Sequence, residues 1–387
     1  MSQGIGADIS VLRGIGCRTD ADRVEDDQEC FHGEVVCIGI VPSQIIWYRN
    51  PMKGASHLQT AEYWRLRPEG GLECELCPHH CCLHEGNTGR CRVRTVLGGE
   101  LKATGYGFLS SVHVDPIEKK PLYHFHPGSP IFSLGGWGCN FGCAFCQNWT
   151  ISQDFRKSET VHTPRQIVQA MRDEECAHVA YTYNEPLVGF EFVRDCSRLV
   201  RLDGGKNVLV TNGFIEEKPA AELLTLVDAL NVDIKSMDEA FYKEYCKGSL
   251  APVLRFCRQA ANAGCHLEVT NLIIPGLNDT DEGFEKLAEW IHDELGPLTP
   301  LHLSAYHPDF RFETPPTSGE TLQRAWDITR KKLAYVYMGN VLTKTGQDTL
   351  CPACESMLIR RRGYQVSPVG LQDGSCARCG RKADLIT

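Results

Sequence analysis

Residues 138–149 of this chain read Gly-Cys-Asn-Phe-Gly-Cys-Ala-Phe-Cys-Gln-Asn-Trp and directly follow a short apolar run at residues 131–134. The three cysteines, Cys139, Cys143 and Cys146, have the spacing C-x3-C-x2-C. Three thiolates at this spacing can bind three irons of a cubane [4Fe–4S] cluster and leave the fourth iron without a protein ligand, unlike the four-cysteine runs of ferredoxins. The alternative is a structural zinc knuckle. Zinc sites close with a fourth ligand nearby, and none follows directly after these cysteines.

A strand–helix alternation repeats six times between about residues 130 and 340. The strand candidates are residues 130–135, 178–183, 207–213, 229–235, 266–274 and 301–306, and helical stretches begin near Pro164, Val188, Pro219, Glu239, Asp281 and Gly319. This pattern predicts an α/β fold with a parallel sheet. Because six units are two fewer than an eight-stranded barrel contains, we expect an open partial (β/α)6 barrel with its chemistry at the C-terminal ends of the strands.

Two further cysteine groups flank this core. They are Cys74, Cys77, Cys81 and Cys91 on one side and Cys351, Cys354, Cys376 and Cys379 on the other. The second group consists of two C-x2-C pairs separated by 21 residues, which is typical of a zinc ribbon, although a rubredoxin-like iron site uses the same ligands. The first group could bind structural zinc or an auxiliary iron–sulfur cluster, and its Cys-Pro-His turn favours zinc.

We therefore expect four regions in the 387 residues. They are an unassigned N-terminal extension at 1–56, a cysteine-rich module at 57–125, the partial-barrel core at 126–342, and a zinc-ribbon or rubredoxin-like module at 343–387. The net charge of −9 gives no footprint for DNA or anionic membranes, and no run of eighteen apolar residues occurs. Twenty cysteines, clustered at metal-ligand spacings in a chain of this length, indicate a reducing compartment. A cytoplasmic protein is expected.

Polar residues follow the second and fourth predicted strands, where the active face is expected. The second strand ends in Tyr-Asn-Glu-Pro, which contains Asn184 and Glu185, and the fourth ends in Asp233-Ile234-Lys235. Strand alternation places Asp233 and Lys235 on one face, where opposite charges are costly unless they pair or are used. They either contact a bound ligand or form an internal ion pair. Glu185 either accepts hydrogen bonds from a ligand's ammonium group or caps the next helix.

Three more residues are candidates for the same site. Asn278 lies in a Pro-Gly turn after the fifth strand and could be a simple helix cap. His307 follows the sixth strand and is either a ligand contact or a structural histidine. Phe145 directly precedes Cys146 and either belongs to the cofactor site or packs in the core.

Together these motifs resemble those of the radical S-adenosylmethionine (radical SAM) enzyme of the three-protein AmmeMemoRadiSam system, whose core is similar to that of pyruvate formate-lyase activase. The resemblance covers about residues 60–382. It is carried by both flanking cysteine groups, Asp-Pro-Ile-Glu-Lys-Lys-Pro-Leu at 115–122, the three-cysteine loop, the Tyr-Asn-Glu-Pro loop, Asn-Val-Asp-Ile-Lys at 231–235 and Ile-Pro-Gly-x-Asn at 274–278. The sixth strand reads Ser-Ala-Tyr-His at 304–307 where relatives have Arg-Phe-His, which puts an arginine contact in doubt.

The resemblance implies a [4Fe–4S] cluster and SAM as cofactors, and it implies zinc in a flanking module. The cluster would reductively cleave SAM to a 5′-deoxyadenosyl radical that abstracts hydrogen from an unidentified substrate. Glu185 would receive the SAM ammonium group. The implied partners are a reduced ferredoxin- or flavodoxin-type electron donor and, in the same system, AMMECR1-domain and Memo proteins. The implied cofactor-binding residues are Phe145, Asn184, Glu185, Asp233, Lys235, Asn278 and His307.

Two other functions compete with this interpretation. A glycyl-radical-enzyme activase, similar to pyruvate formate-lyase activase, would use the same core to act on a glycine of a partner protein. A zinc-knuckle nucleic-acid-binding or scaffold protein is the more distant alternative. The basic stripe and the aromatic platform that nucleic-acid binding requires are missing from the sequence.

Overall fold

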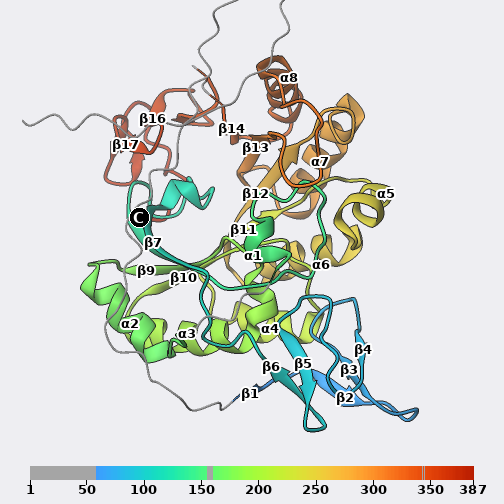
Figure 1. The fold of residues 1–387 in the computed structure, drawn as a ribbon. Helices are drawn as coiled ribbons and strands as arrows, with labels where there is room; N and C mark the ends of the chain where they lie inside the picture. Colours follow the sequence, from blue (N-terminus) through green and yellow to red (C-terminus); the bar gives the residue numbers. More distant parts are fainter. Residues whose placement is uncertain (1–57, 155–159, 342, 344) are drawn as a thin grey trace, which may run out of the picture. The chain divides into compact units, whose positions relative to one another are not determined.

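The computed structural model describes residues 58–154, 160–341, 343 and 345–387 of the chain (Figure 1). The predicted N-terminal extension at residues 1–56 lies outside these residues. Among the helices of the described part, none is long and apolar enough to cross a membrane.

An eight-stranded sheet forms the centre of the described chain (Figure 1). Its order, β14-β13-β12-β11-β10-β9-β8-β7, follows the sequence strand by strand, and all neighbouring pairs from β8 to β14 are parallel. Strand β7 is antiparallel to β8 and lies at one edge. The bounds are β7 Ser111–Pro116, β8 Pro130–Gly135, β9 His178–Tyr181, β10 Lys206–Thr211, β11 Ala229–Asp233, β12 His266–Ile273, β13 Leu301–Ala305 and β14 Val336–Gly339.

All six predicted strands are present, and the parallel α/β architecture is confirmed. The two edge strands, β7 and β14, were not predicted. Strand β14 is followed by another strand and not by a helix, so it does not continue the strand–helix alternation. Strand β7 is mostly half-buried and ends in Asp115-Pro116, a polar pair that is more typical of a turn.

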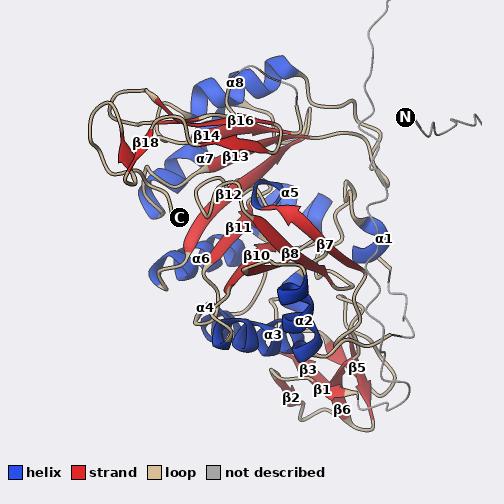
Figure 2. Cartoon of the chain, turned by 90° about the vertical axis from the view of Figure 1, so that its left-hand side faces the viewer, coloured by secondary structure: helices blue, strands red, loops and turns tan. Residues whose placement is uncertain are grey.

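Helices connect the parallel strands and pack against the sheet (Figure 2). Capping side chains start several of them: Thr163 forms a capping box with Gln166, while Thr280 and Ser318 accept hydrogen bonds from first-turn N–H groups. The helix bounds are α1 Trp149–Ser152, α2 Pro164–Asp173, α3 Phe190–Leu202, α4 Glu217–Leu224, α5 Glu239–Phe241, α6 Leu250–Asn262, α7 Asp281–Glu294 and α8 Gly319–Thr329.

One predicted helix is interrupted. The helix expected from Glu239 is a three-residue α5 that continues as a π-helical turn, η3 (Tyr242–Cys246), and α6 begins only at Leu250. Lys247 ends the turn in the left-handed conformation, with φ of 61°. Isolated π turns are rare and occur frequently at functional sites.

Short antiparallel sheets flank the core. On the N-terminal side, one sheet has the order β1-β6-β5 and another the order β2-β3-β4, and on the C-terminal side the order is β15-β16-β17, with a separate β18-β19 pair. The N-terminal bounds are β1 Gln59–Thr60, β2 Trp64–Leu66, β3 Leu72–Cys74, β4 Cys82–Leu83, β5 Arg94–Leu97 and β6 Glu100–Ala103. The C-terminal bounds are β15 Thr349–Leu350, β16 Met357–Arg362, β17 Gln365–Ser367, β18 Leu371–Gln372 and β19 Ser375–Cys376.

A buried carboxylate, Glu268, lies near the N-terminal end of β12 and binds a segment of the chain between β7 and β8. It accepts hydrogen bonds from the backbone N–H groups of Tyr123 and His124, at 3.0 and 2.7 Å. Its two oxygens also lie 2.9 and 2.6 Å from the rings of His266 and His302. Burial alone would raise the pKa of Glu268, but the two imidazoles outweigh burial and hold the pKa well below its usual value.

The C-terminal module packs against the same segment. Arg361 on β16 is fully buried, donates to the carbonyl of Tyr123 at 2.7 Å, and lies 4.1 Å from the centre of the Tyr123 ring. The ring of His124 contacts the hydroxyl of Tyr337 on β14 at 2.7 Å. The position of the segment that Glu268 holds therefore also determines how the C-terminal module attaches to the core.

We predict that Glu268→Gln lowers the free energy of unfolding by about 3 kcal/mol, because an amide cannot accept hydrogen bonds from four groups at once. Guanidinium denaturation followed by circular dichroism measures the change. The control is Glu282→Gln, which alters an exposed carboxylate at the start of α7 and should leave the midpoint nearly unchanged. An unchanged midpoint in the Glu268 variant would show that the network does not stabilise the fold.

Candidate functional site

The three predicted cluster cysteines lie in the loop that follows β8. The π turn η3 holds this loop through two backbone hydrogen bonds: the Gly142 N–H donates to the Cys246 carbonyl at 2.8 Å, and the Ala144 N–H donates to the Tyr245 carbonyl at 3.1 Å. A regular helix would keep both carbonyls for its own N–H groups. The interrupted helix thus provides the acceptors that fix the loop.

The residues of this loop fit a [4Fe–4S] cluster. Cys139 Sγ accepts the Phe141 N–H at 3.3 Å, and the Asn212 amide lies 3.7 Å from the same sulfur. Such N–H donors stabilise the thiolates that bind iron. Among the described residues, the sulfurs of Cys139, Cys143 and Cys146 do not form a group of atoms within 4.8 Å of one another. This wide spacing suits a polynuclear cluster better than one ion.

Glycine is required just before the first cysteine. Gly138 has φ of 80°, and a Cβ there would lie 2.2 Å from the carbonyl oxygen of Cys91. The N-terminal module therefore packs directly against the start of the cysteine loop. Only a residue without a side chain allows this approach.

Glu185 is buried at the C-terminal end of β9 and accepts three hydrogen bonds. The donors are the hydroxyl of Thr211 at 2.6 Å, the N–H of Asn212 at 2.8 Å and the N–H of Leu187 at 3.0 Å. By accepting the Leu187 N–H, Glu185 caps the short 3-10 turn η2 (Pro186–Gly189). The predicted capping role of Glu185 is therefore confirmed. Burial nevertheless raises the pKa of Glu185 to about 7.

Asp233 and Lys235 form an ion pair of 3.0 Å at the C-terminal end of β11. Burial opposes a charge on Lys235, but Asp233 and the thiols of Cys143 and Cys246 outweigh it and raise the pKa of Lys235 well above its usual value. The pair is therefore both the internal ion pair and a charged group beside the cluster loop. The two interpretations from the sequence are compatible.

The side chains of two predicted site residues, Asn184 and Asn278, form hydrogen bonds with backbone groups. Asn184 donates to the carbonyls of Trp137 and Gly138, at 3.0 and 3.1 Å, and accepts from the N–H of Gly136 at 2.8 Å. Asn278 donates to the Lys235 carbonyl at 2.6 Å. It also donates to the carbonyl of Leu272 at 2.8 Å, so it ties the ends of β11 and β12 together. The cap of α7 is Thr280, so a simple capping role for Asn278 is wrong.

The last two predicted residues, Phe145 and His307, differ in their burial. Phe145 is buried and packs against Phe241 and Phe312. The centre of its ring lies 5.9 Å from that of Phe241 and 6.3 Å from that of Phe312. His307 is exposed, and its Nδ1 lies 3.4 Å from the Pro308 carbonyl. The structure thus gives Phe145 a packing role and leaves the His307 ring accessible at the C-terminal end of β13.

Two residues beside the cysteines were missed as site residues. Asn212 directly follows β10, and its amide nitrogen also donates to Asn140 Oδ1 at 2.9 Å. Its position after an apolar strand was the available signal. Cys246 lies outside the three cysteine groups of the sequence, yet its thiol forms a hydrogen bond that lowers the pKa of Cys143. Its closeness to Cys143 depends on the π turn, which the sequence does not predict.

The C-terminal cysteines form a compact site. All four sulfurs of Cys351, Cys354, Cys376 and Cys379 lie within 4.8 Å of one another. The Cys351–Cys379 and Cys354–Cys376 sulfur distances are 3.6 and 3.7 Å. Tetrahedral ligands at a metal–sulfur distance of about 2.3 Å would stand about 3.8 Å apart. This group therefore has the spacing of a site for one ion.

The N-terminal cysteines are arranged differently. Cys74, Cys77, Cys81 and Cys91 all line one cavity between the N-terminal sheets and η2. In the described part of the chain, their sulfurs do not form a group within 4.8 Å of one another. Their neighbour Cys82 is exposed and does not line the cavity. Although Cys82 follows Cys81 directly in the sequence, it is therefore not one of the cavity-lining thiols.

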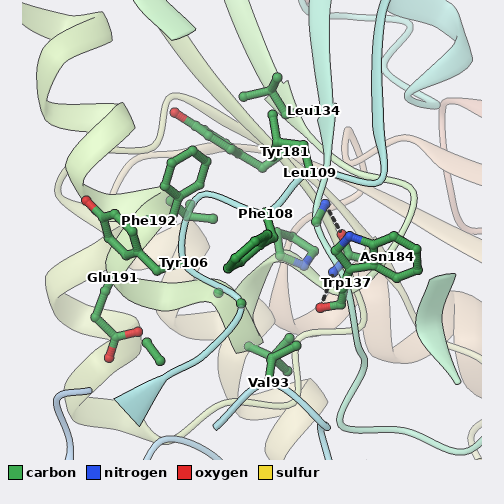
Figure 3. Close-up of a pocket in the computed structure, with 17 residues that line it drawn as sticks. Val93, Tyr106, Phe108, Leu109, Leu134, Trp137, Tyr181, Asn184, Glu191 and Phe192 are labelled. Carbon is green, nitrogen blue, oxygen red and sulfur yellow. Dashed lines mark hydrogen bonds between the residues drawn. The ribbon is translucent and has the colours of Figure 1, made fainter. Parts of the chain in front are cut away.

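A mainly apolar pocket lies behind the cysteine loop (Figure 3). Phe108 and Leu109, from the segment after β6, face Phe192 of α3 across it, and Trp137 and Asn184 close one end. These residues show that the cluster loop, the N-terminal module and α3 meet at one place.

Comparisons with known proteins agree with this geometry. The profile described as Radical SAM superfamily matches residues 136–291. Uncharacterized protein MJ0808 of Methanocaldococcus jannaschii is 42% identical over 336 residues, which cover 85% of this chain and 100% of that protein. Pyruvate formate-lyase 1-activating enzyme of Escherichia coli is 27% identical over 176 residues, 44% of this chain and 71% of the enzyme. A solved domain of pyruvate-formate lyase-activating enzyme from Bacteroides vulgatus has a TM-score of 0.37 and 23% identity, covering 42% of this chain and 98% of that domain.

We predict that Cys379→Ala removes one metal ion, zinc or iron, from the C-terminal module and leaves the iron of the core site in place. Elemental analysis of the anaerobically prepared protein measures both. Cys265→Ala is the matched control, because this half-buried thiol lies outside all three cysteine groups and should change neither value. Loss of the core iron in the Cys379 variant would contradict the division into separate sites.

Proposed function

We propose a division of roles among the site residues of this chain, which belongs to the radical SAM superfamily and shares its family with MJ0808. The chain is a radical SAM enzyme that uses a [4Fe–4S] cluster and SAM. The bound cluster supplies the electron that cleaves SAM to methionine and a 5′-deoxyadenosyl radical, which abstracts hydrogen from the substrate. The convergence of the three-cysteine loop with Glu185 and the Asp233–Lys235 pair at the C-terminal strand ends carries the proposal.

Cys139, Cys143 and Cys146 bind three irons, and the π turn together with Asn212 holds their loop in position. The hydrogen bonds of Asn184 to the preceding backbone fix the direction from which the loop leaves β8. These contacts restrict the positions that the three thiolates can take.

Glu185 receives the SAM ammonium group. An ionised carboxylate has about four acceptor positions, and three are occupied by Thr211, Leu187 and Asn212. Its Oε2 accepts only the Asn212 N–H, which leaves one position for a further donor. A cation at that position would also compensate the burial of the carboxylate.

Asp233 and Lys235 hold the remaining polar groups of SAM. Lys235 offers a cation for the SAM carboxylate, and Asp233 offers an acceptor for a ribose hydroxyl. Asn278 positions this strand end by binding the Lys235 carbonyl. His307, exposed at the end of β13, and Phe145, packed behind Cys146, complete the site.

We further propose that the sheet is a partial barrel of the radical SAM type and that the C-terminal module is a zinc ribbon. The spacing of its four sulfurs supports the second assignment. The flanking cysteine modules and the other motifs that carry the resemblance support membership of the AmmeMemoRadiSam system, with AMMECR1-domain and Memo proteins as partners. A reduced ferredoxin or flavodoxin supplies the electron.

Activation of a glycyl-radical enzyme is the second candidate function. It is favoured by the similarity to activating enzymes for pyruvate formate-lyase and benzylsuccinate synthase, which are 27% and 23% identical to this chain over the matched residues. The target would then be a glycine of a partner protein. A gene for such a partner beside that of this chain would distinguish the two functions.

We predict that the anaerobically reconstituted protein releases 5′-deoxyadenosine from SAM when a strong reductant is added. Cys143→Ala should abolish this release, whereas Cys379→Ala should retain it. Chromatography of the quenched reaction measures the product. Absence of the product from a chain that carries the full core cluster would refute the proposed reaction.

We predict that SAM affinity weakens as the pH falls from about 8 to about 6. Deprotonated Glu185 accepts the ammonium hydrogen bond, and with its pKa raised to about 7 the carboxyl group becomes protonated within this interval. Isothermal titration of the oxidised, cluster-loaded protein measures the affinity. Glu185→Gln should bind SAM more weakly, with a much smaller pH dependence. Equal pH dependence in both proteins would exclude this role for Glu185.

A further inference from the structure

We propose that Cys74, Cys77, Cys81 and Cys91 bind a second [4Fe–4S] cluster, which passes electrons to the cluster of the three-cysteine loop. The relay part of this proposal rests on the proposed function, while the cluster itself does not. The sequence favoured structural zinc at this position. Three independent features of the structure favour a polynuclear cluster instead.

The first feature is the spacing of the sulfur atoms. The C-terminal group holds its four sulfurs within 4.8 Å of one another, as a single tetrahedral ion requires. The N-terminal sulfurs line one common cavity but are spread more widely, as are those of the three-cysteine loop. In a cubane each thiolate binds a different iron, so the sulfurs stand farther apart than they do around one ion.

The second feature is an unpartnered donor in the same cavity. Arg94 lines the cavity and is 1% exposed. Its terminal nitrogens are used: Nη1 lies 3.1 Å from the carboxylate of Glu191, and Nη2 donates to the Glu62 carbonyl. Its Nε, however, has no hydrogen-bond partner among the residues that the structure describes.

A buried donor without a partner is costly, so a ligand that accepts from Arg94 Nε would remove this cost. A [4Fe–4S] cluster with four thiolates carries a net charge of −2 in its oxidised form and presents sulfide and thiolate acceptors. Hydrogen bonds to these sulfurs are a usual means of setting the reduction potential of such clusters. Arg94 Nε therefore matches such a group as a hydrogen-bond donor, while the charge of the guanidinium is paired with Glu191.

The third feature is direct contact with the core cluster loop. His79 lies two residues after Cys77, and its Nε2 donates to the carbonyl of Asn140 at 2.7 Å, next to Cys139. The Cys91 carbonyl abuts Gly138, on the other side of Cys139. The two cysteine groups are therefore linked by a short path of covalent bonds and one hydrogen bond. A purely structural zinc site would not need this link.

The electron balance of the relay is simple. A reduced ferredoxin- or flavodoxin-type donor gives one electron to the N-terminal cluster, which changes from [4Fe–4S]2+ to [4Fe–4S]1+. Return of this cluster to the 2+ state transfers the same electron to the core cluster, which is reduced from 2+ to 1+. No bond within the protein forms or breaks.

The decisive experiment removes the core cluster by mutation and measures the iron and acid-labile sulfide that remain. The variant in which Cys139, Cys143 and Cys146 are all replaced by Ala is reconstituted anaerobically with iron and sulfide. It should keep about four irons and four acid-labile sulfides per chain and give the electron paramagnetic resonance signal of a reduced cubane with dithionite. Adding Cys77→Ser and Cys91→Ser should remove the sulfide and the signal, whereas adding Cys82→Ser should preserve both.

Zinc without acid-labile sulfide in the core-deficient variant would overturn the proposal. Iron at the C-terminal module cannot mimic the expected result, because a mononuclear site contains no sulfide. If that variant does not fold, the wild-type chain still decides: about eight sulfides support two clusters, and about four exclude the second. These readouts do not depend on SAM cleavage, so they separate failure of this proposal from failure of the proposed function.

The relay role has its own test. Cys77→Ser should retain the core cluster and its spectroscopic response to SAM but lose most of its 5′-deoxyadenosine formation with reduced flavodoxin. Cys82→Ser should match the wild type. An undiminished rate in the Cys77 variant, with the second cluster shown to be absent, would exclude the relay.

Discussion

The backbone of the loop that carries Cys139, Cys143 and Cys146 is the constraint on which the rest of the site depends. Its N–H groups are bound by the carbonyls of the π turn, and its Asn140 carbonyl is bound by His79. Gly138 allows the Cys91 carbonyl to pack against the start of the loop. The loop is therefore held by elements on both sides of it in sequence. A shift in either would move the sulfurs that bind iron.

Two buried carboxylates at opposite ends of the same sheet differ in how their charge is compensated. Glu268 is hydrogen-bonded by two N–H groups and two imidazoles, and its pKa lies well below the usual value. Glu185 has three neutral donors and, within the described part of the chain, no ion-pair partner, and burial raises its pKa to about 7. The first is fully compensated and fixes a segment of the fold. The second lacks a counter-charge, which is the condition expected of a residue that binds a cationic ligand.

Patterns that are local in the chain were predictable. The six inner strands follow from apolar runs, and the three cysteine groups follow from spacing alone. Strand β14 was missed because no helix follows it, so it does not continue the strand–helix alternation. The interruption between α5 and α6 was missed because Tyr242–Cys246 reads as an ordinary amphipathic helix, and the cysteine loop whose N–H groups donate to the Tyr245 and Cys246 carbonyls is remote in sequence. The sequence also does not show that Cys246 and Asn212 lie near the cysteine loop, because this proximity arises from the packing of segments that are remote in sequence.

By itself, the sequence predicted the ligand chemistry of this protein: three thiolates with one iron left open, two further sets of four cysteines, and the carboxylate and ion pair at the strand ends. Residue type and spacing along the chain are sufficient for those inferences. Only the tertiary structure decided how far apart the ligands stand and what lies beside them. It separated the compact C-terminal sulfurs from the more widely spaced N-terminal ones, and it placed Arg94 in the cavity that the N-terminal cysteines line and His79 in contact with the core loop. Distances between segments remote in sequence arise from packing, which no local pattern records.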